Sequence, residues 1–147
     1  MLKQLIVIIV LFFITFYACS KNDRVTLEFR IAENEPAPGL TEKVFDPTGE
    51  SFYLHNEVLI NEADVDSAFV IVQAGRPAIE LLLTAEGTGK FEELTTRNVG
   101  KKCGMLLNGQ LVSAPIIRAP ISVGRAIVAG NFTESEAHSV AQGLNQP

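Results

Sequence analysis

Apolar and polar residues alternate along much of the chain. In residues 25–33 every second position from Val25 to Ile31 is apolar, which is the period-two pattern of a half-buried strand. Similar short runs are bounded by glycine, proline, asparagine and aspartate, the residues that favour turns. The pattern predicts strands at 25–33, 51–55, 68–73, 78–84, 101–107, 110–114 and 125–129, with a further short stretch at 58–60.

The first of two predicted helices covers residues 85–98. Thr84 is a suitable N-cap because its hydroxyl can accept a hydrogen bond from the first helical turn. Phe91 and Leu94 are one turn apart and are expected to face the sheet. Gly100 stands where a left-handed residue commonly ends a helix.

The second predicted helix begins after Thr133 and runs to about Leu144. Thr133 and Glu136 have the spacing of a capping box, in which each side chain bonds the other residue's main chain. Runs of strands interrupted by two helices favour the α+β class. We therefore expect a largely antiparallel sheet with two helices packed on one face.

A hairpin is predicted around Asn108 and Gly109, because both residues tolerate the positive φ of a type I′ turn. The segment after its second strand contains Pro115 and Pro120, each of which lacks a main-chain donor. This segment is therefore expected to be an edge strand or an extended arm.

The hairpin region also resembles a known family. The run GKKCGMLLNGQLVSAPIIRAPI is preceded by TAEGTGKFEELTTRNVG and followed later by GNFTESEAHSVAQGL. In this order the three segments resemble the head of the first periplasmic domain of SecD, a protein-export subunit. The resemblance extends over about residues 65–144. It implies the same α+β layout and a capacity to bind extended or translocating polypeptide.

The segment Ser113–Ile121 is the candidate polypeptide-binding edge, because unpaired main-chain groups of an edge strand can accept an extended peptide. Its candidate residues are Ser113, Ala114, Pro115, Ile116, Ile117, Arg118, Pro120 and Ile121. The alternative is that its isoleucines fill the core beneath the sheet.

The N-terminus has the features of a targeting segment. A single basic residue, Lys3, precedes a short apolar run that ends at Ala18 and Cys19. This resembles a bacterial lipoprotein signal, so we expect cleavage after residue 18 and lipidation of Cys19. Residues 19–24 then form a tether and 25–147 a single extracytoplasmic domain. The alternative is an uncleaved anchor; both place the domain on a membrane outside the cytoplasm.

Composition excludes some classes of function. The net charge is −5, so the chain has no basic surface for nucleic acid. Its histidines, His55 and His138, have no catalytic motif around them, and no cofactor or metal is expected. Cys103 lies in an apolar strand and is expected to be a small buried hydrophobic residue.

Two polar motifs resemble ligand-binding loops but lack the residues that such loops need. Residues 61–66 carry three acids, but they lack the spacing of a calcium loop, so we expect a solvated loop. The run Gly87–Lys90 lacks the earlier glycine and the following hydroxyl of a phosphate-binding loop.

The sequence therefore predicts a non-enzymatic, membrane-tethered domain that binds extended or translocating polypeptide. Apart from the N-terminal segment no membrane span is predicted, so transport itself is not expected to transfer from the resembling family. The alternative function is an envelope lipoprotein module that docks one dedicated protein partner and has no role in export.

Overall fold

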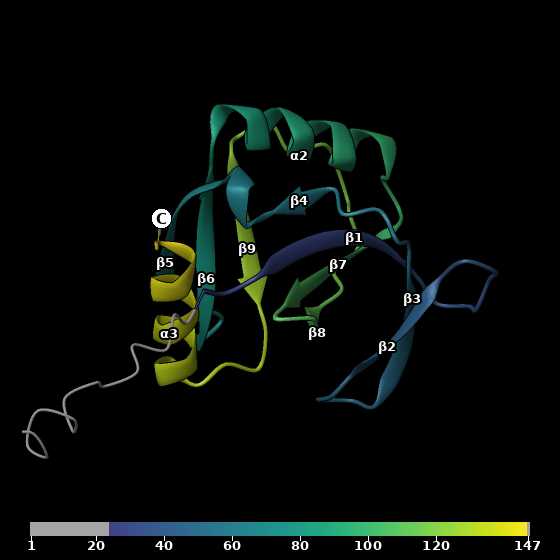
Figure 1. Ribbon diagram of the computed structural model, residues 1–147, viewed down its shortest axis with the longest axis horizontal. Coiled ribbons are helices and arrows are strands. Elements are labelled where there is room, and N and C mark those ends of the chain that lie inside the picture. Colours follow the sequence, from purple (N-terminus) through teal and green to yellow (C-terminus); the bar gives the residue numbers. More distant parts are fainter. Residues whose placement is uncertain (1–23, 147) are drawn as a thin grey trace, which may run out of the picture.

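The computed structural model describes residues 24–146, which form two antiparallel sheets and two helices (Figure 1). In chain order the elements are β1 (Leu27–Glu33), β2 (Thr41–Phe45), β3 (Glu50–Leu54), β4 (Ile60–Asn61), β5 (Val65–Gln73), β6 (Arg76–Leu83), α2 (Ala85–Arg97), β7 (Lys102–Leu107), β8 (Gln110–Ser113), β9 (Arg125–Ala129) and α3 (Glu134–Leu144). Within these residues no helix has the length and hydrophobicity needed to cross a membrane.

The first sheet has the strand order β2-β3-β1-β7-β8, with β4 paired to part of β1. β1 is central because its alternation puts Leu27, Phe29 and Ile31 on one buried face. It pairs with β7 along all but its last residue, from Leu27 opposite Leu107 to Ala32 opposite Lys102.

The second sheet has the order β5-β6-β9. β5 and β6 are joined by a tight turn at Ala74 and Gly75, whose φ values of 50° and 78° match a primed hairpin turn. The inner side of α3 covers this sheet with Ala137, Ala141 and Leu144, which are all buried.

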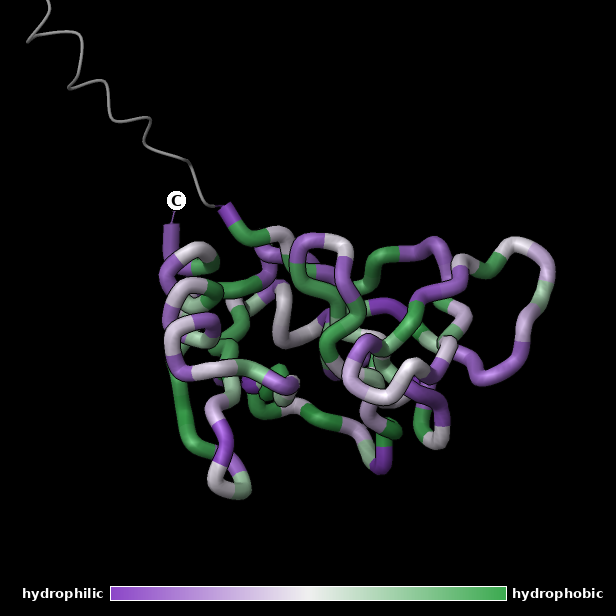
Figure 2. The backbone as a smooth tube through the Cα atoms, turned by 90° about the horizontal axis from the view of Figure 1, so that it is seen from below, coloured by the Kyte–Doolittle hydropathy of each residue, from purple (hydrophilic) through white to green (hydrophobic). Residues whose placement is uncertain are grey.

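The main core lies between the two sheets and is closed by α2. Phe29 of β1 and Phe91 of α2 pack with their ring centroids 6.1 Å apart and their planes tilted by 59°. Burying each such ring contributes about 2 to 3 kcal/mol. Ile79 and Leu81 of β6 are fully buried in the same core. Figure 2 shows hydrophobic stretches toward the middle of the molecule and hydrophilic turns at its periphery.

A smaller core covers the other face of the first sheet. It consists of Ala32, Phe52, Leu54, Leu106 and Leu111, with Phe45 and Ala114 packed against it. β7 is therefore buried on both faces, which explains the unbroken apolar run in its sequence.

The α+β class, the mainly antiparallel pairing and both helices are confirmed. α2 and α3 both pack on the core side of β6, so the prediction of two helices on one face also holds. The strands, however, divide between two sheets, and β2 was not predicted. Its residues Thr41–Phe45 are largely exposed and acquire strand structure by pairing with β3.

Candidate functional site

The candidate segment Ser113–Ile121 leaves β8 and runs beside the start of β7. Cys103 N donates a hydrogen bond to Pro115 O (2.9 Å), and Ile117 N donates to Lys101 O (2.8 Å). One side of the segment's main chain is thus already paired with the first sheet. The segment lies at the margin of that sheet, where its prolines interrupt no central ladder.

The isoleucines of the segment have different environments. Ile117 is 6% exposed and belongs to the main core, whereas Ile116 and Ile121 are 48% and 36% exposed. Ile121 N donates to Thr95 Oγ1 (2.9 Å), which fixes the end of the segment to α2. The core-filling alternative therefore applies to Ile117 alone. Of the other candidate residues, Ser113 and Ala114 are half-buried, and Pro115, Arg118 and Pro120 are exposed.

An open cavity of about 580 Å³, which we call the β9 groove, lies against this segment. One wall is formed by residues 115–119 and Ile121, and the other by Val123 and residues 125–127 with Glu80 beside them. The base is formed by Phe91, Leu94 and Thr95 of α2 and by Cys103 and Met105 of β7. Most of these side chains are apolar, so the groove favours an apolar ligand.

The rim of the groove exposes several large apolar side chains. Val123 is 72% exposed and Ile127 is 36% exposed, across the groove from Ile116. Phe69 of β5, which is 49% exposed, extends the apolar surface, since Phe69, Glu80 and Ile127 are paired in one row across the second sheet. Clustered exposed apolar residues commonly mark an interaction site.

The charges at the groove are few. Arg125 Nη1 lies 3.4 Å from Glu80 Oε1, so these two charges compensate each other. Arg118 is exposed and has no ion pair or hydrogen-bond partner for its side chain within residues 24–146. Among the described residues, the groove therefore carries one uncompensated positive charge and one ion pair in a mainly apolar surface.

Cys103 lies at the base of the groove and is 3% exposed. Its burial raises the pKa of the thiol to about 12, which keeps it protonated and unreactive at neutral pH. The prediction that Cys103 acts as a small buried hydrophobic residue is confirmed.

The wall formed by β9 was not identified from the sequence. Ile127 and Val128 are consecutive apolar residues, so one of them had to face away from the core. That signal was present, but the sequence does not show that β9 and the segment Ser113–Ile121 face a common groove.

The predicted turn at Asn108 and Gly109 is confirmed, with φ values of 50° and 76°. Asn108 N donates to Thr26 O (2.9 Å), and Thr26 N donates to Asn108 Oδ1 (3.0 Å). The turn therefore also fixes the entry of the chain into β1.

The prediction of a solvated loop at residues 61–66 is wrong in its secondary structure and at Asp64, although most of these residues are exposed. Residues Glu62–Asp64 form a short 3₁₀ helix, and Asp64 is only 3% exposed. Its carboxylate accepts hydrogen bonds from Lys90 Nζ (2.8 Å) and Asn61 N (3.0 Å). Asp64 and Glu86 raise the pKa of Lys90, mainly through their side-chain hydrogen bonds. Lys90 supplies the charge that permits burial of Asp64.

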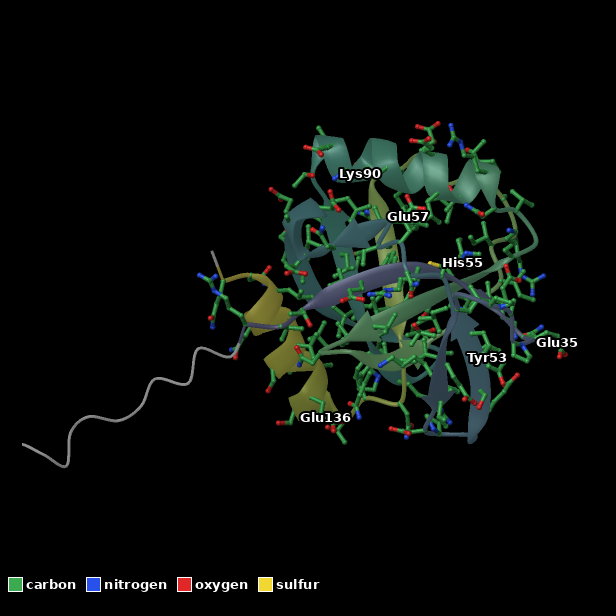
Figure 3. The ribbon with its side chains drawn as sticks, turned by 45° about the vertical axis from the view of Figure 1, so that its right-hand side comes forward. Glu35, Tyr53, His55, Glu57, Lys90 and Glu136 are labelled. Atoms are coloured by element: carbon green, nitrogen blue, oxygen red, sulfur yellow. The ribbon has the colours of Figure 1, made fainter. Side chains whose placement is uncertain are left out.

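A second polar cluster lies beneath α2, where Figure 3 shows His55, Glu57 and Lys90. His55 Nε2 is 3.1 Å from Glu33 Oε1, and Lys101 Nζ is 3.8 Å from the same oxygen. Over the described part of the chain, no group of three or more histidine, cysteine, aspartate or glutamate side chains is arranged to hold a metal ion.

The predicted signal segment 1–18 and the predicted lipidation residue Cys19 lie outside the described residues. Lipid attachment and cleavage remain predictions.

The sequence and fold were compared with known proteins. The family model described as "SecDF, P1 head subdomain" matches residues 39–146. The protein translocase subunit SecDF of Thermus thermophilus is 35% identical over 136 residues, which are 82% of this chain and 18% of that protein. The SecD subunit of Aquifex aeolicus is 38% identical over 93 residues, covering 63% of this chain and 18% of that protein.

Solved structures agree with the sequence matches. A crystal structure of SecDF in a "super-membrane-facing form" superposes with a TM-score of 0.67 and 30% identity, covering 83% of this chain and 19% of that one. A structure reported for SecDF as a membrane component that enhances protein export gives the same TM-score, with 29% identity and 62% of that chain covered. The chain spans about a fifth of the length of the curated relatives that it matches. It belongs to the SecDF P1 head subdomain family.

Proposed function

We propose that this chain is a non-enzymatic domain that binds extended or translocating polypeptide during protein export. In this proposal it is held on a membrane of the bacterial cell envelope by an N-terminal lipid or anchor and faces the extracytoplasmic side. Family membership supports the export role, since the matched relatives are named protein translocase subunits.

The proposal that the chain binds polypeptide rests on one observation. The segment Ser113–Ile121 is paired with the first sheet on one side only, and its Ile116 and Ile121 border the apolar β9 groove. This open groove of about 580 Å³ is lined mainly by apolar residues. It therefore suits a stretch of extended polypeptide better than it suits the charged surface of a folded protein. Such contacts without deep pockets give affinities on the order of micromolar or weaker.

The test follows backbone amide shifts by NMR when an unfolded, reduced model polypeptide is added to the isotope-labelled protein. Shifts are expected on the segment Ser113–Ile121 and on β9. The variant Ile116→Asp should weaken them, because it places a charge on the apolar rim. Ile117 is unsuitable for this purpose because it is buried in the core.

The matched control is Val44→Asp, since Val44 is 50% exposed on β2 and Ile116 is 48% exposed. The control should leave the shifts unchanged. Absence of shifts at millimolar polypeptide, or shifts confined to α2 and α3, would overturn the proposal. A module with one dedicated envelope partner would then be the better account.

A further inference from the structure

The hydrogen-bonding register of β9 determines which of its main-chain groups are free. Leu83 N donates to Gly124 O at 2.9 Å, which extends the β6–β9 ladder by one pair beyond the strand. Bonded and non-bonded pairs alternate along an antiparallel ladder. Ala126 and Val128, two and four residues after Gly124, are therefore the β9 residues whose N–H and C=O groups bond β6.

Arg125 and Ile127 then direct their N–H and C=O groups away from β6. β9 is the last strand of the second sheet, and among the described strands it pairs only with β6. Throughout residues 24–146, the outward main-chain groups of Arg125 and Ile127 have no hydrogen-bond partner. They lie in the wall of the β9 groove, on the side of the sheet that faces β7 and β8 (Figure 1).

The opposite edge of the same sheet is blocked at Ala68. β5 forms that edge, and at Ala68 its outward groups are bonded by the side chain of Asn145, with distances of 2.7 and 2.9 Å. Side-chain blocking is a common way to prevent unwanted strand pairing. The fold thus blocks the β5 edge at this position. It leaves the β9 edge unpaired at Arg125 and Ile127, beside an apolar groove, whereas other residues of β9 lie against β8.

We propose that β9 accepts one segment of extended polypeptide as a fourth strand of the second sheet, within the β9 groove. This inference rests on the proposed function and differs from it by assigning the strand-accepting edge to β9, not to Ser113–Ile121. In strand addition, main-chain bonds provide affinity and every second side chain provides specificity.

The groove also defines the chemistry of the accepted segment. Alternate side chains of the added strand face Ile116 and Ile121, so apolar β-branched residues fit at those positions. Arg118 is the uncompensated charge, since Arg125 is paired with Glu80. A segment with a carboxylate near Arg118 is therefore favoured over one with lysine or arginine there.

The probe is a short, capped, dye-labelled peptide that alternates valine and threonine and carries one glutamate. Fluorescence anisotropy measures its binding to the full chain in a non-ionic detergent, with protein-free micelles as the blank. A second set of peptides carries a single backbone N-methyl group at each position in turn. N-methylation is expected to weaken binding at every second position only, because alternate N–H groups point toward β9.

Three protein variants separate main-chain from side-chain effects. Ile127→Pro removes one outward N–H and blocks the edge, while the bonds of Ala126 and Val128 to β6 remain; it should weaken binding by about tenfold. Ile127→Ala keeps the N–H and should weaken binding by about threefold or less. Val72→Pro on β5 is the matched control. Gln73 and Arg76 close the β5–β6 hairpin as a hydrogen-bonded pair, so the N–H of the neighbouring Val72 points away from β6, on the far edge of the sheet.

The outcomes distinguish the inference from the proposed function. In one outcome the peptide binds, N-methylation has the same effect at every position, and Ile127→Pro binds as well as Ile127→Ala. β9 is then not the accepting edge, but the proposal that the chain binds polypeptide stands. If the peptide does not bind at millimolar concentration, both fail. If instead the chain forms a dimer that Ile127→Pro disperses, the occupant of β9 is a second copy and the inference is overturned. Circular dichroism confirms that each variant is folded.

Discussion

The side chain of Asn145 makes two hydrogen bonds with the main chain of Ala68, from Ala68 N to Asn145 Oδ1 (2.7 Å) and from Asn145 Nδ2 to Ala68 O (2.9 Å). An amide side chain is suited to this because it has a donor and an acceptor side by side. The contact joins the end of α3 to the edge of β5, 77 residues earlier in the chain.

Asn145→Ala is expected to lower the free energy of unfolding by about 1 to 2 kcal/mol, since two partly buried main-chain groups lose their partners. Chemical denaturation of wild type and variant measures the change. Gln146→Ala is the control, because Gln146 is exposed and adjacent. Equal stability of Asn145→Ala and wild type would show that water replaces the side chain without loss.

Gly109→Val is expected to destabilise the protein by about 1 kcal/mol or more, because a β-branched residue resists positive φ. Gly109 has a φ of 76° in the β7–β8 turn, and no atom lies within 4 Å of an added Cβ. The loss would therefore come from backbone strain without a steric clash. A melting temperature unchanged within error would contradict this account of the turn.

The capping box of α3 makes stability depend on pH. Hydrogen bonds from the main-chain N–H of Thr133 and from its hydroxyl lower the pKa of Glu136 below its usual 4.5. A carboxylate with a lowered pKa stabilises the fold above its unfolded pKa, and this contribution disappears as pH falls through the folded pKa. Figure 3 shows Glu136 at the end of α3 where this cap lies.

Glu136→Gln is therefore expected to lower the melting temperature at pH 7 and to have little effect at pH values below the folded pKa of Glu136. Thermal unfolding from neutral to acidic pH provides the test. Glu134→Gln is the control, because Glu134 is also in the first turn but does not form the capping box. A difference between wild type and Glu136→Gln that is constant with pH would contradict the electrostatic explanation.

The sequence predicted those elements whose limits are set by local chemistry. α3 begins after Thr133 because the Thr133 hydroxyl and the Glu136 side chain bond the main-chain amides at the start of the helix. The spacing of these two residues in the sequence is enough to recognise this capping box. β9 was predicted with its observed limits, since Gly124 and Gly130 bound an apolar run.

Features that depend on distant partners were not predicted. A period-two pattern shows that a strand has a buried face, but it does not identify the neighbouring strand, so the division into two sheets was missed. The sequence pattern does not show that Asp64 is buried, because its partner Lys90 is 26 residues away. The β9 groove was missed for the same reason: its walls are extended segments from two different sheets.

Lipid attachment at Cys19 is a separate prediction that depends on the N-terminal pattern. In a bacterial host supplied with labelled fatty acid, the wild-type protein should take up label and Cys19→Ser should not. Cys103→Ser is the control, because Cys103 is buried and should not carry the lipid. If the wild type takes up no label, an uncleaved N-terminal anchor is the better account.

The response of polypeptide binding to salt tests which forces act in the β9 groove. Within residues 24–146, Arg118 is the one uncompensated charge there, since Arg125 and Glu80 are 3.4 Å apart. An exposed ion pair contributes at most about 1 kcal/mol, so raising the ionic strength from low to high should weaken binding of the glutamate-bearing peptide by no more than about fivefold. Arg118→Gln should remove most of that salt response while retaining most of the affinity, because main-chain bonds and apolar contacts remain. A much steeper salt dependence, or loss of binding in Arg118→Gln, would mean that charge dominates and that the ligand is an acidic surface and not an extended apolar segment.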